Sequence, residues 1–133
     1  MLGQEALSQT PQTSLPVVYP FEGLPGVSAV LVQPDGHFDL SRSLATLNAL
    51  EDARQSGRVR GLVWDVRNRL DHPSASEIRA LVSYFDRWER VAVLTGPDVQ
   101  YAMARLAALL SDRVAAARTA AEAVSWMRGA AKP

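Results

Sequence analysis

The chain has 133 residues, of which 47% are hydrophobic and 21% charged, so it is long enough for one domain with a single core. Fourteen basic and fourteen acidic residues cancel, and no field of one sign is present to attract nucleic acid or an anionic membrane. The lack of cysteine excludes disulfides, thiol catalysis and cysteine-based zinc sites, and it fits a cytoplasmic location.

The first 14 residues are rich in Gln, Ser and Thr without any period, which predicts a flexible tail before a domain at residues 15–133. Residues 17–22 and 27–33 are apolar and separated by Leu-Pro-Gly, so we expect an antiparallel pair of strands. Pro20 places the first strand at a sheet edge, because proline cannot donate to a neighbouring strand. No stretch approaches ~18 uninterrupted apolar residues, so no membrane span is expected.

The next segment predicts a helix that begins at a cap on Asp39 or Ser41 and ends near Gly57. Four leucines recur at helical spacing and are expected to form its buried stripe: Leu40, Leu44, Leu47 and Leu50. Polar residues between them are expected on the solvent side: Ser43, Asn48, Asp52 and Arg54.

Residues 61–88, GLVWDVRNRLDHPSASEIRALVSYFDRW, predict a strand, a polar loop and an amphipathic helix. Ser74 and Glu77 have the spacing of a capping box at the start of that helix. The apolar face of the helix continues at steps of three and four through Ile78, Leu81, Val82, Phe85 and Trp88.

The rest of the chain alternates in the same way. Residues 90–95 predict a central parallel strand, and residues 113–118 a short last strand. Asp98 is expected to cap the helix between them, and Thr119 with Glu122 to open the final helix. The predicted core face of the helix after Asp98 consists of Val99, Ala102, Met103, Leu106, Leu109 and Leu110.

The order of elements is β-β-α-β-α-β-α-β-α. Alternating strands and helices with short loops indicate an α/β single domain, with a mixed, mostly parallel five-stranded sheet and about four helices.

Three features of the chain resemble the SpoIIAA-like (STAS) group, the fold of the anti-sigma-factor antagonists. They are the element order, the segment GLVWDVRNRLDHPSASEIRAL, and the ending ERVAVLTGPD followed by RVAAARTAAEAVSWM, which is similar to an uncharacterised bacterial branch of the group. The likeness covers residues 17–129. It implies a non-enzymatic signalling module that binds a protein partner, such as a regulator or kinase.

Some members of this group are switched by phosphorylation of a serine at the start of the second helix, and that position falls on Ser74 or, as second choice, Ser76. Signalling members carry an Asp-Ser-Ser-Gly type of sequence, whereas here Asp71 is followed by His-Pro-Ser-Ala-Ser. The candidate phosphorylation or partner site therefore consists of Ser74, Ser76 and Asp71. A phosphate on Ser74 would lie at the positive end of a helix. Helix capping alone also explains a serine at this position.

Other polar residues offer weaker sites. Asp65, Thr95 and Asp98 follow predicted parallel strands, where α/β proteins bind ligands, although each has an ordinary strand-end or capping role. An enzyme would have to use Asp65, Asp71 and His72 together. No metal-ligand spacing and no glycine-rich phosphate loop is present, so we expect no metal and no cofactor.

The predicted strands are apolar on both faces. If all four helices covered one face, the other face would need the N-terminal segment, a ligand or a second copy of the chain, and a homodimer is the simplest of these. The three tryptophans are expected in the core, but they could also line an apolar pocket. A carrier of a small apolar ligand or lipid, held between sheet and helices, is therefore the alternative function.

Overall fold

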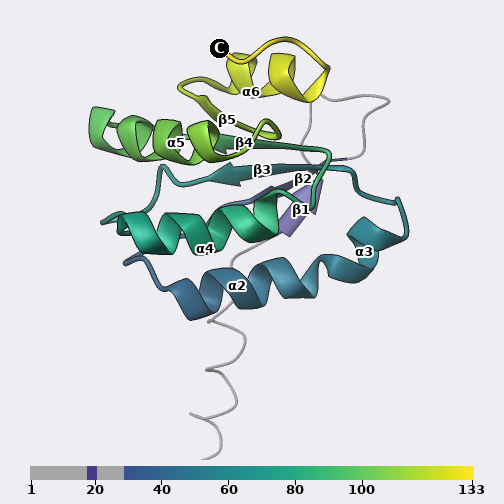
Figure 1. The fold of residues 1–133 in the computed structure, drawn as a ribbon, viewed down its shortest axis with the longest axis horizontal. Helices are drawn as coiled ribbons and strands as arrows, with labels where there is room; N and C mark the ends of the chain where they lie inside the picture. Colours follow the sequence, from purple (N-terminus) through teal and green to yellow (C-terminus); the bar gives the residue numbers. More distant parts are fainter. Residues whose placement is uncertain (1–17, 21–28) are drawn as a thin grey trace, which may run out of the picture.

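The computed structural model describes residues 18–20 and 29–133, and a five-stranded sheet runs through its centre (Figure 1). The strands lie side by side in chain order: β1 (Val18–Pro20), β2 (Ala29–Val32), β3 (Gly61–Asp65), β4 (Arg90–Leu94) and β5 (Val114–Ala117). The four strands from β2 to β5 are parallel, and β1 pairs antiparallel with β2 at the edge. The predicted α/β class and mostly parallel sheet are confirmed, whereas the predicted tail at residues 1–14 lies outside the described residues.

Five helices are present in the described part, where about four were expected: α2 (Leu40–Ala49), α3 (Glu51–Gln55), α4 (Ala75–Phe85), α5 (Asp98–Leu110) and α6 (Ala120–Met127). The additional helix arises because the segment predicted as one helix is divided at Leu50. There the backbone N–H of Leu50 bonds to Leu47, three residues back, which tightens the last turn of α2. None of the described helices has the length and apolar character needed to cross a membrane.

The helices cover both faces of the sheet. α2, α4 and α5 pack on one face, over a core that includes Trp64, Phe85 and Trp88. α6 packs on the other face against β4 and β5 and buries Trp126 and Met127 there (Figure 1). The condition under which one face would be bare, that all helices lie on one side, is not met. The argument for a homodimer from a bare sheet face therefore no longer applies, and the homodimer stays a prediction.

Small residues let α6 approach the sheet closely. Alanines and one glycine face it, among them Ala92, Ala115 and Gly61. A methyl group on Gly61 would lie 2.8 Å from the sulfur of Met127, closer than van der Waals contact allows. The last strand of small residues, predicted from the sequence, is therefore half of a tight helix–sheet contact.

The predicted core face of α5 was wrong in part. Met103 and Leu106 pack against the core as expected, whereas Val99, Ala102, Leu109 and Leu110 are exposed. Val99 is half exposed, and Leu109 is 78% exposed, although both were expected in the core. The buried face instead carries Gln100, Ala104 and Ala107. Alanines allow the helix axis to lie close to the sheet and to α4, and Val99, Leu109 and Leu110 are turned outward.

Side chains cap most of the longer helices. Asp39 caps α2 and Thr119 caps α6, and each accepts a hydrogen bond from a backbone N–H in the first turn. Glu122 follows Thr119 as expected, but its carboxylate accepts from the N–H of Arg118. The prediction that Asp98 caps α5 was wrong, because Pro97 holds the cap position and Asp98 is already helical.

Candidate functional site

The loop between β3 and α4, residues 66–73, lies across the carboxyl end of the sheet. Its first residue, Val66, donates its N–H to the carbonyl of Leu94, and Leu70 donates to the carbonyl of Gly36 at 2.9 Å. Gly36 also forms an isolated parallel bridge with Arg69. The loop is thus fixed to β4 on one side and to the turn before α2 on the other.

Arg69 makes this attachment rigid. Its Nη1 donates to the carbonyls of Asp35 and His37 at 3.0 and 2.8 Å, and its Nη2 donates to the hydroxyl of Ser43 at 3.3 Å. Its guanidinium also lies over the ring of Phe38, 5.4 Å from the centroid. Burial lowers the pKa of Arg69 from its usual value. Ser43 was expected at the surface, and it is buried because Arg69 binds it.

Asp71 ties the same two segments together from the solvent side. One carboxylate oxygen accepts the backbone N–H of Phe38, and the other lies 3.0 Å from Nδ1 of His37. The hydrogen bond from Phe38, followed by that from His37, lowers the pKa of the Asp71 carboxyl. This residue was predicted as part of a partner site, and its exposed carboxylate also holds the loop in place.

Ser74 begins α4 as predicted. Its hydroxyl accepts the N–H of Glu77 at 3.3 Å, and the Glu77 carboxylate accepts the N–H of Ser74 at 2.8 Å, which completes a capping box. Ser76 follows two positions later in the first turn of α4, and its hydroxyl lies 3.2 Å from that of Ser74. Both serines are exposed. Both hydroxyls are therefore accessible to solvent at the positive end of an 11-residue helix.

Asp65 is buried at the end of β3, with its side chain 2% exposed. Burial alone would raise the pKa of this carboxyl. Hydrogen bonds from the side chains of Arg67 and Gln33 and from the Arg67 backbone outweigh that effect, and its pKa lies below the ordinary value. The distances from the carboxylate to Nη2 of Arg67 and Nε2 of Gln33 are 2.8 and 3.0 Å. Asp65 thus holds the turn after β3.

The other two predicted ligand-loop residues also have structural partners. The hydroxyl of Thr95 is buried and donates to the carbonyl of Ala117 at 3.0 Å. Asp98 is 91% exposed and forms an ion pair of 2.9 Å with Arg118. Asp65, Thr95 and Asp98 therefore face different surroundings and do not converge on one ligand.

The residues considered for an enzyme do not converge either. Asp65 binds Arg67, Asp71 binds His37 and Phe38, and Nδ1 of His72 lies 3.5 Å from the carbonyl of Pro73. Among residues 18–20 and 29–133, no group of three or more His, Asp or Glu side chains is placed to hold a metal ion.

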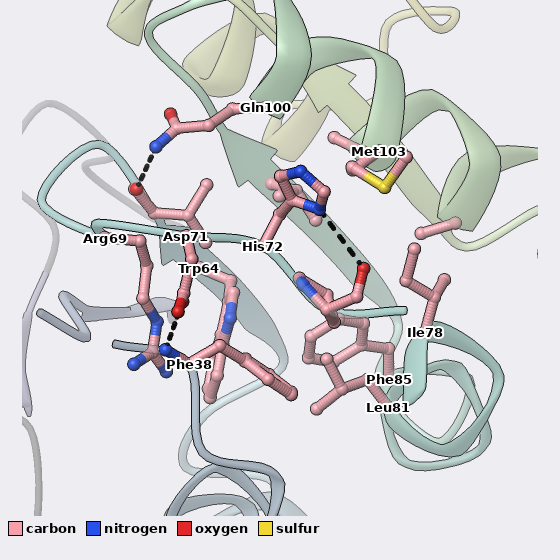
Figure 2. A pocket seen from close by; sticks show the side chains of 15 residues that line it. Phe38, Trp64, Arg69, Asp71, His72, Ile78, Leu81, Phe85, Gln100 and Met103 are labelled. Carbon is pink, nitrogen blue, oxygen red and sulfur yellow. Dashed lines mark hydrogen bonds between the residues drawn. The ribbon is translucent and has the colours of Figure 1, made fainter. Parts of the chain in front are cut away.

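A pocket lies between α4, α5 and the carboxyl end of the sheet (Figure 2). The sequence suggested an apolar pocket between sheet and helices lined by tryptophans; Trp64 lines this one, whereas Trp88 and Trp126 do not. The space inside the pocket that the centre of a water molecule can occupy is about 60 Å³. Apolar side chains form most of its wall. The loop that precedes Ser74 supplies one side of the mouth. The lining residues are Phe38, Trp64, Val66, Arg69, Asp71, His72, Pro73, Ile78, Leu81, Phe85, Val93, Gln100, Met103, Ala104 and Ala107.

Gln100 fixes the edge of this pocket next to the sheet. Its Nε2 donates to the carbonyl of Val66 at 2.8 Å (Figure 2). Its Oε1 accepts the N–H of Gly96, also at 2.8 Å. One buried amide thus satisfies two backbone groups from two loops. The signal in the sequence was a polar residue on the helix face that also carries Ala104 and Ala107, and the larger apolar residues concealed it.

The fold is that of a solved anti-sigma factor antagonist, SpoIIAA in its unphosphorylated form. The two structures superpose with a TM-score of 0.57 over 81% of this chain and 95% of the other, at 16% sequence identity. Searches with family models and against curated proteins find no match. The chain therefore has a SpoIIAA-like fold, in agreement with the resemblance found in the sequence.

Proposed function

We propose that this SpoIIAA-like domain is a non-enzymatic regulatory module, and that a protein partner binds the surface formed by the β3–α4 loop and the first turn of α4. The observation that carries this proposal is the exposed Ser74 at the start of α4, beside a loop that Arg69 and Asp71 hold in one conformation. A surface fixed before binding loses little conformational entropy when a partner docks.

Phosphorylation of Ser74 is the proposed switch. A phosphate would add a charge of about −2 to a surface that already carries the acidic side chains of Asp71 and Glu77. It would also displace the Glu77 carboxylate, which lies 2.8 Å from the Ser74 N–H, and take over that carboxylate's place at the helix end. The partner would then meet a changed charge and a changed first turn. A kinase of the same regulatory system would supply the phosphate.

Two variants of Ser74 separate charge from capping. Ser74→Asp and Ser74→Asn both retain a good capping side chain, and only the first adds a negative charge. We expect the partner captured from the source cell by the wild type to bind Ser74→Asn normally and Ser74→Asp at least tenfold more weakly. Equal binding by the two variants would rule out a charge switch at this position. Phosphopeptide mass spectrometry on the chain from those cells tests the modification itself.

The pocket supports the second candidate, a carrier of a small apolar ligand. By the same measure of volume one water needs roughly 10–15 Å³, so about 60 Å³ accommodates a group of a few heavy atoms. A ligand retained through purification, seen by native mass spectrometry as an added mass that Ala104→Leu removes, would favour this function. An apoprotein mass alone would favour the interaction module.

A further inference from the structure

We propose that the pocket between α4 and α5 receives one apolar side chain of the partner protein, of the size of leucine. This inference rests on the proposed function and adds to it the chemistry of the contact. The partner would present a leucine-like residue that enters the pocket while its backbone and neighbouring side chains cover the β3–α4 loop.

The wall of the pocket suits such a group. Trp64 and Phe85 meet edge to face at its base, with ring centroids 5.4 Å apart. Ile78 and Leu81 line the side formed by α4, and Met103 lies across from them on α5 (Figure 2). A thioether side chain is unbranched and polarizable, so it adapts to a guest. The pocket exists because α5 turns alanines toward it.

The size of the pocket argues for a single side chain. A pocket of about 60 Å³ accepts several heavy atoms. A lipid chain of twelve or more carbons would need a much longer tunnel. Anchoring residues at protein interfaces fill small desolvated pockets of this kind, and they contribute most of the binding energy.

The mouth of the pocket points to a protein as the source of that side chain. Asp71 and His72 form a polar rim beside the apolar opening. Leu70 lies in the same loop and is 71% exposed, so an apolar side chain stands outside the pocket next to the rim. An apolar centre with a polar rim is the anatomy of a protein interface, and a free small molecule inside the pocket would leave Leu70 uncovered.

The same loop joins the pocket to the proposed switch. Pro73 lines the pocket, and Ser74 follows it directly as the cap of α4. A partner whose side chain occupies the pocket would therefore lie over Ser74. A phosphate at Ser74 would stand at the edge of the buried contact, where its charge and bulk would oppose docking of the partner.

The test uses protein labelled with ¹³C at the methionine methyl groups. The chain has three methionines; Met103 lines the pocket and Met127 lies on the opposite face of the sheet, so Met127 is an internal reference. The probe is N-acetyl-L-leucinamide, and laurate is titrated in parallel. We expect the leucinamide to give a saturable shift of the Met103 signal with none at Met127, and laurate to give no saturable shift.

Matched variants on α5 complete the test. Ala104→Leu fills the pocket and should abolish the Met103 shift, whereas Ala102→Leu places the same side chain on the exposed side and should preserve it. Ala107→Val fills the pocket from the next turn and replaces Ala104→Leu if that variant does not fold. No saturable shift in the wild type, an unchanged shift in the filled variants, or saturable binding of laurate would overturn the inference.

A last measurement separates this inference from the proposed function. The captured partner should bind Ala104→Leu at least tenfold more weakly than Ala102→Leu. If the partner discriminates Ser74→Asp from Ser74→Asn but binds the two alanine variants equally, the pocket inference fails and the interaction module stands.

Discussion

The carboxylate of Asp71 accepts a hydrogen bond from the backbone N–H of Phe38, which lies 33 positions earlier in the chain. This contact joins the loop before α4 to the segment before α2, and both residues line the pocket. The shape of the proposed binding surface therefore depends in part on one exposed carboxylate, beside the contacts of Arg69 and Leu70 with the same segment.

Asp71→Ala should loosen this junction without unfolding the domain. The Phe38 amide loses its acceptor, so its hydrogen exchange with solvent should become much faster. His72→Ala, at the neighbouring loop position, should leave the Phe38 amide as protected as in the wild type. Amide exchange followed by NMR checks both variants, and continued protection of Phe38 in Asp71→Ala would contradict the proposed role of this bond.

Ser74→Ala should destabilise the domain by about 1 kcal/mol, because the capping hydroxyl at the start of α4 is lost. Ser74→Asp should be close to wild type in stability, since aspartate also caps a helix well. Ser76→Ala should change the free energy of unfolding by less than about 0.5 kcal/mol, because its hydroxyl is exposed. Urea unfolding of the three variants measures these differences. Equal losses in Ser74→Ala and Ser76→Ala would show that the capping box contributes nothing.

Asp65→Asn should lower the free energy of unfolding by about 2 kcal/mol at neutral pH. The buried carboxylate, which accepts hydrogen bonds from Arg67 and Gln33, becomes a neutral amide in this variant. The folded-state pKa of Asp65 is below its ordinary value of 3.8. Its contribution is therefore fully present above that pH, and it is lost as the pH falls through the lower folded-state value. The stability difference between wild type and Asp65→Asn should shrink in acid.

Urea unfolding at pH 7 and near pH 3 measures this change. Asp98→Asn is the control, because Asp98 is almost fully exposed and its loss should have no measurable effect at either pH. A stability difference for Asp65→Asn that stays constant between the two pH values would show that the carboxylate charge is not the source of the effect.

Trp126→Phe tests the contact of α6 with the second face of the sheet. The indole N–H donates to the carbonyl of Val91 at 2.9 Å, and the guanidinium of Arg90 lies 3.9 Å from the ring centroid. Losing the buried hydrogen bond and weakening the cation–π contact should cost about 1–2 kcal/mol, measured by thermal or urea unfolding. An unchanged midpoint would mean that the indole hydrogen bond and the cation–π contact add little to the stability of the fold.

The order of strands and helices could be predicted because each element carries a local signal. Ser74 and Glu77 mark a helix start by spacing alone, and the parallel strands are continuous apolar runs. The orientation of α5 could be predicted only in part, because periodicity favours large apolar residues, whereas close packing selected Ala104 and Ala107 next to Met103 and Leu106. That α6 covers the second face of the sheet was not predicted for the same reason. Small residues such as Ala92 and Ala115 do not indicate from sequence that a helix packs on them.

The candidate site was predicted in part. Ser74 and Asp71 do lie together at the start of α4, because they are near neighbours in sequence. A pocket between sheet and helices that could involve Trp64 was proposed from the sequence, but its position was not, since it combines Phe38, Trp64 and Met103 from three distant segments. Arg69 was also missed, because an arginine in a polar loop gives no sign that it will bind two carbonyls 32 and 34 positions earlier in the chain.

Site-specific photocrosslinking in the source cell tests most directly whether a protein docks at the start of α4. A photoreactive side chain at Ser76 would lie on the proposed surface, and one at Arg58, before β3, would lie at the opposite end of the strand. We expect one discrete protein adduct from position 76, none from position 58, and loss of the adduct when Ser74→Asp is added. Equal adducts from both positions, or an adduct at position 76 that Ser74→Asp leaves unchanged, would contradict the account.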